Sequence, residues 1–169
     1  MANVFLGVRR IRPESLWERY QYMKLVTLNI TDKELVKNFF REVFTKEPWN
    51  DDWSDEEQLD LYMLDLMGNH NSLTLAYFDD EELVALAMGH IRHWYSATEY
   101  YIDELCVKTQ LQGQGIGGKF ISAIEEYLKK HDMKAIFLLT ENDVPAYDFY
   151  KNHGFKELKN NVAFAKWLS

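Results

Sequence analysis

The sequence has one cysteine, Cys106, and no apolar run that approaches the roughly 20 residues of a membrane-spanning helix. A single cysteine excludes an intrachain disulfide, and it cannot by itself build a thiolate metal site. The five histidines show no metal-ligand spacing, so we expect no metal. The apolar residues 4–6 precede Arg9, Arg10 and Arg12, which reverses the order of a secretory signal. We therefore expect a cytoplasmic protein.

Basic residues are outnumbered as well: 19 lysines and arginines face 27 aspartates and glutamates, for a formal net charge of −8. General nucleic-acid binding relies on clustered basic charge that neutralises phosphates, and docking on anionic lipid has the same need. The charge balance therefore argues against nucleic-acid and membrane partners.

The composition is otherwise that of a globular chain, with 169 residues, 47% apolar and 27% charged. Such a length predicts one domain and excludes disorder and collagen-like structure. Residues 1–21 carry four arginines and two glutamates, unlike the acidic remainder. We expect residues 1–21 to be an N-terminal appendage and residues 22–169 to form the domain.

Apolar periodicity and turn signals predict the element order βααβββαβαββ. Capping boxes beginning at Thr31 and Ser54 mark the starts of the first two helices. The other helices are expected at about residues 116–130 and 144–152. The strands are expected at residues 23–29, 72–78, 83–94, 98–108, 135–139, 155–158 and 162–168. This order indicates an α/β protein of the α+β type, with about four helices flanking a mixed, mostly antiparallel sheet of six to seven strands.

A glycine-rich loop precedes the third helix, with glycines at 113, 115, 117 and 118. Glycines allow backbone conformations closed to other residues and let a ligand approach closely. The amides of such a loop, at the positive end of a helix dipole, bind phosphate oxygens.

Two phosphate motifs fit this loop poorly. Gly113-x-Gly115-x-x-Gly118 matches the dinucleotide fingerprint, but about 50 residues remain after it, too few for a doubly wound sheet. Gly113-x-x-x-x-Gly118-Lys119 matches a Walker loop until Phe120 replaces the Ser or Thr that would hold Mg²⁺.

A third reading fits both the loop and the residues after it. Gln112-x-x-Gly115-x-Gly117, after Leu105-x-Val107, resembles the acetyl-coenzyme A signature of the GNAT N-acetyltransferase superfamily. Residues 146–155 resemble the family's second signature, an alanine, a hydrophobic-Tyr pair and then Gly-Phe. The resemblance implies a single acetyltransferase domain whose sheet is splayed open between the fourth and fifth strands.

The resemblance also implies how acetyl-CoA is held. Backbone groups of the fourth strand would pair with the pantetheine arm, and the loop would cradle the pyrophosphate. The implied cofactor-binding residues are Leu105, Cys106, Val107, Gln112, Gly113, Gln114, Gly115, Ile116, Gly117 and Gly118. The family often has an asparagine seven residues before its tyrosine. Here that position is Asp143, and either Asn142 fills the role after a one-residue shift or Asp143 caps the helix.

The resemblance implies direct attack of an amine on the thioester. Tyr150 corresponds to the tyrosine that protonates the departing sulfur; otherwise it would pack as core. The base is Asp103 or Glu104, with water as a relay in either case. Because these two are consecutive on a strand, we expect them to point to opposite faces. Residues 101–107 resemble the same strand in polyamine acetyltransferases of the family, and that resemblance slightly favours Asp103 as the acid near the amine. Cys106 has no assignable histidine partner and is expected to be a buried strand residue, not a nucleophile.

An acidic stretch lies between the first two expected helices, with seven acids and no base from Glu47 to Asp60. In this superfamily the corresponding loop borders the acceptor site. Trp49, Trp53 and Asp52 would suit a cationic amine through charge and cation–π attraction. Alternatively, the acids begin a helix and the tryptophans cover the core.

The expectation is an N-acetyltransferase that moves acetyl from acetyl-CoA to a primary amine, preferably a small cationic one such as a polyamine or aminoglycoside. The alternatives are a protein N-terminal or lysine acetyltransferase, and a non-catalytic acyl-CoA-binding sensor. A homodimer is compatible with the sequence, since many relatives dimerise. The acceptor itself is not specified by the sequence.

Overall fold

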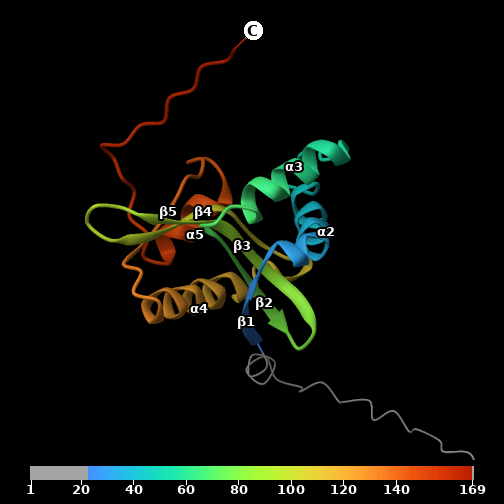
Figure 1. The fold of residues 1–169 in the computed structure, drawn as a ribbon, viewed down its shortest axis with the longest axis horizontal. Coiled ribbons are helices and arrows are strands. Elements are labelled where there is room, and N and C mark those ends of the chain that lie inside the picture. The colour runs from blue at the N-terminus through green and yellow to red at the C-terminus, as the bar shows by residue number, and fades with distance from the viewer. Residues whose placement is uncertain (1–22, 169) are drawn as a thin grey trace, which may run out of the picture.

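The computed structural model describes residues 23–168, and Figure 1 shows their arrangement. The expected appendage at residues 1–21 lies outside the described residues. The helices are α2 (Lys33–Phe44), α3 (Glu56–Met67), α4 (Ile116–Lys130) and α5 (Pro145–Asn152), with short 3₁₀ turns at Ile30–Asp32 and Thr109–Leu111. The strands are β1 (Met23–Leu28), β2 (Ser72–Asp79), β3 (Glu82–His93), β4 (Thr98–Val107) and β5 (Ala135–Leu138).

These strands form one sheet in the order β1-β2-β3-β4-β5. The first four are antiparallel neighbours, and β5 runs parallel to β4. The parallel pair needs a crossover, which α4 provides on its way from β4 to β5 (Figure 1). The expected α+β architecture with a mixed, mostly antiparallel sheet and four helices is therefore confirmed.

Two apolar clusters fill the space on the two faces of the sheet. Phe40, Leu59 and Met63 pack α2 and α3 against one face, where Met88 and Cys106 belong to the same cluster. Phe120 and Ile124 pack α4 against the other face, with Tyr100 and Ile102. Each fully buried side chain of this size stabilises the fold by about 1.5–3 kcal/mol. The sheet is thus a rigid platform covered on both sides.

Both capping predictions were wrong by one or more residues. Asn29, not Thr31, caps the first turn: its side chain accepts from the Thr31 amide, and the Asp32 carboxylate accepts from the Asn29 amide. Asp55, not Ser54, caps α3 by accepting from the Gln58 amide. In each case a neighbouring Asx side chain was equally able to cap, which the sequence pattern does not resolve.

The two strands expected near the C-terminus do not form, so the sheet has five strands instead of six or seven. Residues 155–168 are extended or turn-forming, and they include large exposed apolar side chains such as Val162, Phe164 and Trp167. The apolar composition of residues 162–168 is typical of a strand, but the chain runs away from the sheet after a turn in which the Asn161 amide donates to the Leu158 carbonyl (Figure 1). Within residues 23–168 the segment pairs with no strand.

Candidate functional site

The two consecutive carboxylates on β4 lie on the same face of the sheet. Glu104 pairs with Met88 and Ile102 pairs with Gly89, so Asp103 is an extra residue in a β-bulge. Asp103 contacts His90, which lies two residues from Met88 on β3 and therefore on the same face. The prediction that Asp103 and Glu104 point to opposite faces was wrong, because the bulge breaks the alternation that it assumed.

Glu104 is half-buried and is held by a tyrosine of α3. The Tyr62 hydroxyl donates to Glu104 Oε1 at 2.5 Å. Burial raises the pKa of Glu104, and the negative charges of Asp51 and Asp103 raise it further, while the bond from Tyr62 lowers it. Glu104 is therefore a stronger base than an ordinary glutamate.

Asp103 is paired with a histidine across the hairpin. His90 Nδ1 lies 3.0 Å from Asp103 Oδ2, and the His90 ring stacks on Tyr101 at 5.2 Å between centroids. When Nδ1 carries the proton, it donates to the carboxylate and Nε2 is the basic nitrogen. The same face thus carries two separate proton-accepting groups, one centred on Glu104 and one on the Asp103–His90 pair.

Tyr150 lies on α5, between two aromatic rings. Its ring centroid is 5.3 Å from that of Phe149 and 5.2 Å from that of Phe155. Burial raises the pKa of Tyr150, and the charge of Glu104 and the nearby Cys106 raise it further. A Cβ on Gly117 would meet both Phe149 of α5, which directly precedes Tyr150, and Val107 of β4, so α5 packs near the end of β4. The phenol stays protonated at neutral pH.

The edge of β4 beside Tyr150 is open. Pairing between β4 and β5 covers only Glu99–Ile102, so residues 103–107 extend past the end of β5. Leu105 and Val107 pack partly buried on the α4 face, whereas Cys106 is buried on the other. All four residues of β5 pair with β4, so the unpaired stretch arises because β5 ends, and the predicted splay between the fourth and fifth strands stays a prediction. The strand expected to meet the pantetheine arm is the one with the unpaired edge.

The glycine loop divides into two pairs with different physical roles. Gly113 and Gly115 have φ of 70° and 80°, which other residues adopt only with strain, and a Cβ on either would meet no atom within 4 Å. A Cβ on Gly117 would lie 2.9 Å from Phe149 Cε2, and one on Gly118 would lie 2.4 Å from His153 Nε2. The second pair therefore lets α5 pack closely against the first turn of α4.

The remaining loop residues shape the backbone. Ile116 is buried and begins α4, directly after the left-handed Gly115. The Gln112 side chain donates to the Val107 carbonyl at 3.0 Å, and the Gln114 side chain donates to the Gln110 carbonyl at 2.9 Å. The first bond ties the loop to the end of β4, and the second closes the loop on itself. Asn142, in the segment before α5, lines the same groove as Tyr150.

Cys106 is buried, with 5% of its surface exposed. Burial raises the pKa of its thiol, and the charge of Glu104 raises it further. The thiol stays protonated at neutral pH, so it has the properties of a core residue.

The two tryptophans of the acidic stretch take different positions. Trp53 stacks on Tyr62 at 5.2 Å between centroids and so reaches the surroundings of Glu104. The Trp49 ring lies 6.0 Å from the Phe44 ring between centroids and packs against the cluster of α2 and α3. Asp52 accepts from the Ser54 amide, and hydrogen bonds from Ser54 lower the pKa of Asp52. Trp53 lies at the site, while Asp52 organises the loop.

Sequence reasoning missed Tyr62, Asp51 and His90. Tyr62 lies on the face of α3 that meets β4, and its spacing from the apolar residues of the helix predicts a core residue and no catalytic role. The sequence did not indicate a role for His90, because its contact with Asp103 depends on the register between β3 and β4. Within residues 23–168 no group of three or more His, Cys, Asp or Glu side chains is arranged to hold a metal ion. None of the helices in this part of the chain is long and apolar enough to cross a membrane.

Comparison with known proteins agrees with this geometry. The model of the acetyltransferase (GNAT) family matches residues 33–155. No curated protein matches the chain. Similar solved structures include the aminoglycoside acetyltransferase meta-AAC0020 from an uncultured soil metagenomic sample, in complex with sisomicin. It is 22% identical over 88% of this chain and 98% of its own, with a TM-score of 0.67.

Two further solved structures have the same fold. A possible acetyltransferase from Clostridium difficile 630 is 16% identical over 88% of this chain and 99% of its own, with a TM-score of 0.71. AAC(6′)-Iy, in complex with the bisubstrate analogue CoA-S-monomethyl-acetylneamine, is 14% identical over 86% of this chain and 99% of its own, with a TM-score of 0.66. The family model runs from the start of α2 to the residue after the glycine that ends α5, and this chain belongs to the GNAT acetyltransferase family.

Proposed function

We propose that this protein transfers an acetyl group from acetyl-CoA directly to a primary amine of a small cationic compound, such as an aminoglycoside or polyamine. The observation that carries the proposal is the convergence of a basic carboxylate and a protonated phenol beside the open edge of β4. Glu104 lies in the part of β4 that extends past β5, and Tyr150 follows Phe149, which packs at Gly117 beside Val107 at the end of the same strand. A base and an acid at one site are what amide formation from a thioester requires.

The residues present fit acetyl-CoA. The exposed β4 edge at residues 105–107 offers alternating donors and acceptors to an extended amide arm. The left-handed Gly113 and Gly115 place backbone amides at the N-terminus of α4, where a pyrophosphate is stabilised. Gln112, Gln114 and residues 116–118 complete this cradle, and Asn142 borders the groove. Acetyl-CoA supplies the acetyl group already activated as a thioester.

Two side chains of this chain handle the protons. Glu104 accepts the proton that the amine loses, directly or through one water, as the new C–N bond forms. Tyr150 donates its phenolic proton to the sulfur as the C–S bond breaks, and the phenol then regains a proton from solvent. The raised pKa of Glu104 keeps it basic enough to compete for an ammonium proton, and the raised pKa of Tyr150 keeps it protonated beforehand. Asp103 with His90 is a second route for the amine proton.

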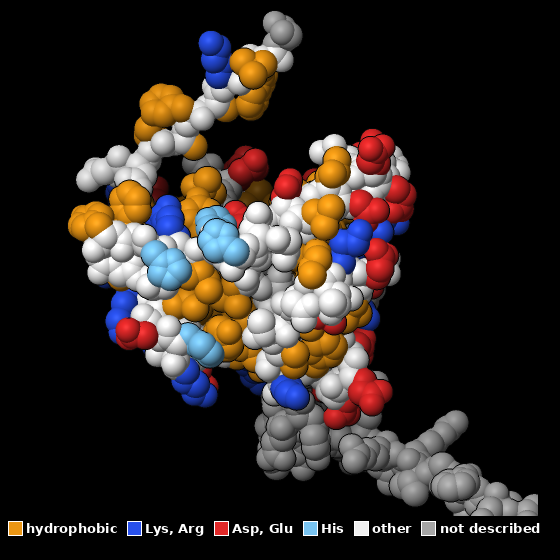
Figure 2. Space-filling model, viewed as in Figure 1, with side chains coloured by type: hydrophobic (Ala, Val, Ile, Leu, Met, Phe, Trp, Pro, Cys, Tyr) orange, Lys and Arg blue, Asp and Glu red, His pale blue; other side chains and the backbone are white. Residues whose placement is uncertain are grey.

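A cationic acceptor is favoured by the charges and rings around Glu104. Asp51, Asp103 and Glu104 are close enough that each acid affects the titration of the site. Trp53 stacked on Tyr62 presents aromatic faces, which attract cations. Acidic side chains also gather over α2 and α3 (Figure 2), and meta-AAC0020 was solved with the aminoglycoside sisomicin. We infer that the acceptor enters between α3 and β4.

The test is thiol release from acetyl-CoA with a panel of sisomicin, spermidine, a lysine-containing peptide and a peptide with a free N-terminus. We expect release with the small cationic amines above the rate without amine. Tyr150→Phe is expected to lower kcat by about 10²- to 10⁴-fold, the usual contribution of a positioned acid. Tyr147→Phe on the same helix is the matched control, since Tyr147 lines the groove and bonds to Glu157.

Each outcome bears on the proposal. Thiol release with the peptides and not with the small amines would indicate that the acceptor is a protein. Binding of acetyl-CoA without amine-dependent release across the panel would indicate a sensor. An equal loss of kcat in the Tyr150→Phe and Tyr147→Phe variants would contradict the assignment of Tyr150 as the acid.

A further inference from the structure

A row of planar side chains lies across β3, β4 and β5, which are neighbours in the sheet (Figure 1). We name it the planar row, and its members are His90, Arg92, Tyr101 and Phe137. Tyr101 pairs with His90 on one side and with Phe137 on the other, and Arg92 is two residues from His90. Such positions share one face of a sheet. Because His90 contacts Asp103, the planar row lies on the face that carries the carboxylates of β4.

The members of the planar row pack against one another. The His90 ring stacks on Tyr101 at 5.2 Å between centroids. The guanidinium carbon of Arg92 lies 5.5 Å from the centre of the Tyr101 ring and 5.4 Å from that of Phe137. Trp94, which directly follows β3, lies 5.2 Å from the same carbon. Three rings around one guanidinium restrict its motion, so a ligand that binds it loses little conformational entropy.

A buried carboxylate holds Arg92 and compensates its charge. Arg92 Nε and Nη2 donate to Glu99 Oε2 at 3.0 Å and 2.7 Å. Glu99 is 5% exposed, whereas 39% of the Arg92 side chain is exposed. A guanidinium has five N–H donors, and Glu99 uses two of them. Arg92 therefore presents further donors at the surface while its charge is paired.

The planar row borders the groove that contains Tyr150, which Arg92, Tyr101 and Phe137 help to line. The polar groups of the row are of both kinds. Arg92 donates, the Tyr101 phenol donates and accepts, and His90 Nε2 accepts when Nδ1 donates to Asp103. A ligand hydroxyl also donates and accepts, so it can bond to each of these groups. An ammonium group only donates, and Arg92 offers it no acceptor.

We propose that the planar row recognises hydroxyl groups of the acceptor, which makes the acceptor a polyhydroxylated amine of the amino-sugar class and not an open-chain polyamine. The inference rests on the proposed acetyl transfer and adds Arg92 and Tyr101 as specificity-determining residues. The reacting amine lies at Glu104, and the hydroxyl-bearing ring extends from there along the planar row. An acceptor without hydroxyls leaves the polar groups of the row unpaired, so it binds less well.

The test compares two amines of similar size. Glucosamine and cyclohexylamine both carry a primary amine on a six-membered ring, with and without hydroxyl groups. The measured quantity is the ratio of their kcat/KM values in the thiol-release assay, because effects of a substitution on acetyl-CoA binding cancel in this ratio. We expect the parent protein to prefer glucosamine by at least about 10-fold, which corresponds to two or three hydrogen bonds.

Two substitutions remove the recognition groups and keep most of the packing. Tyr101→Phe removes one hydroxyl and retains the ring, and it is expected to lower the ratio by about 2- to 10-fold. Arg92→Lys retains a cation beside the buried Glu99 but loses the planar set of donors, and it is expected to lower the ratio by about 10-fold. Tyr95→Phe is the matched control, because Tyr95 is 92% exposed at the β3–β4 turn, outside the planar row. It should keep the parent ratio.

A binding measurement distinguishes failure of this inference from failure of the proposed function. Nuclear magnetic resonance titration of each amine into the protein with excess CoA gives the ratio of Kd values without turnover. If no amine releases thiol, the proposed acetyl transfer is wrong, and the Kd ratio decides whether the planar row recognises hydroxyls. A parent protein that does not prefer glucosamine overturns the inference. So does a preference that both Tyr101→Phe and Arg92→Lys retain. Circular dichroism confirms that each variant is folded.

Discussion

Tyr62 of α3 donates a hydrogen bond to Glu104 of β4 at 2.5 Å, which joins the helical layer to the carboxylate beside the open strand edge. The contact matters because the hydrogen bond from Tyr62 lowers the pKa of Glu104, whereas burial and the charges of Asp51 and Asp103 raise it. Loss of this hydrogen bond is therefore expected to raise the pKa of Glu104 while the fold stays intact.

We predict that Tyr62→Phe moves the acid limb of the pH profile of kcat/KM to higher pH. The bond from Tyr62 lowers the pKa of Glu104, so its loss raises that pKa and the base is protonated over a wider range. The parent limb should already lie above the ordinary glutamate value of about 4.3. Tyr95→Phe, at an exposed turn, should leave the limb in place. A limb that moves down in the Tyr62 variant would contradict this assignment.

We predict that Gly118→Ala destabilises the fold by about 1–3 kcal/mol, the usual cost of overpacking. The added methyl would meet the His153 ring, which is held by a bond between its Nδ1 and the Phe149 carbonyl at 2.7 Å. Urea unfolding measures the loss. In a His153→Ala background the same change should cost clearly less, because the ring is gone. An equal cost in both backgrounds would place the strain elsewhere.

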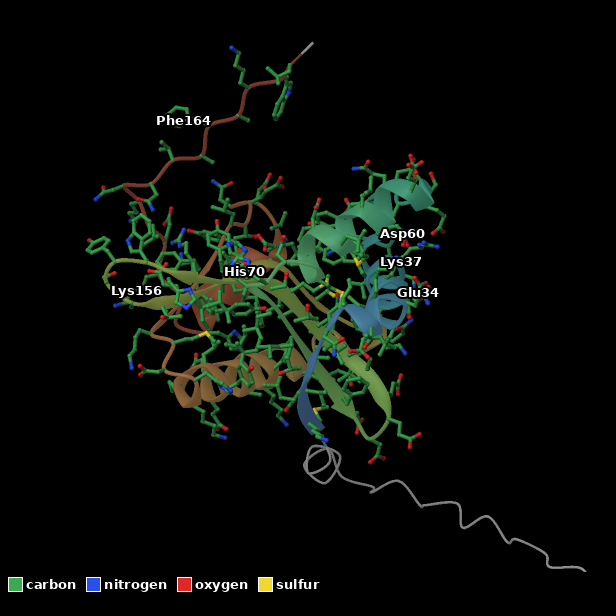
Figure 3. All side chains as sticks on the ribbon, viewed as in Figure 1. Glu34, Lys37, Asp60, His70, Lys156 and Phe164 are labelled. Carbon is green, nitrogen blue, oxygen red and sulfur yellow. The ribbon has the colours of Figure 1, made fainter. Side chains whose placement is uncertain are left out.

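We predict that Asp60→Asn reduces the loss of unfolding free energy that the protein shows as the pH falls below about 4. Asp60 accepts from Lys33 at 2.7 Å and from Lys37 at 2.9 Å, and these bonds lower the pKa of Asp60 (Figure 3). A lowered pKa contributes stability above the unfolded value near 3.9, and that contribution is lost as the pH falls through the folded value. The difference in urea midpoint between pH 7 and pH 3 should shrink in the variant. Asp65→Asn on the same helix changes the net charge equally and serves as the control.

We predict that Cys106 reacts with a thiol-specific disulfide reagent at least about 100-fold more slowly in the native protein than in urea. The side chain is buried and burial raises the pKa of its thiol, so little thiolate is present. Absorbance of the released thiolate measures the rate. Fast modification of the native protein would show that the end of β4 opens readily.

The sequence predicted the central fold because its local signals agree with one another. Apolar runs bounded by polar turns predicted β2, β3 and β4, and the glycine loop located the start of α4. The bulge at Asp103 could not be predicted, since it depends on the register between β3 and β4. The same register determines the contact of His90 with Asp103.

One other prediction failed, and one was incomplete, for different physical reasons. Residues 162–168 have strand composition, but the turn in which the Asn161 amide donates to the Leu158 carbonyl directs them away from the sheet, and local composition does not specify that direction. At the glycine loop, local reasoning assigned all four glycines to ligand binding. Gly117 and Gly118 in fact also face side chains of α5, which lies about 30 residues further along the chain.

That packing has a mechanical result. Phe149, which a Cβ on Gly117 would strike, directly precedes Tyr150. The first turn of α4, proposed to hold the diphosphate, and α5, which carries Tyr150, are therefore in direct contact. A shift of one of them displaces the other. A substitution that widens the contact between Gly117 and Phe149 should move the Tyr150 hydroxyl away from the sulfur that it is proposed to protonate. The affinity for the nucleotide part of acetyl-CoA should change little.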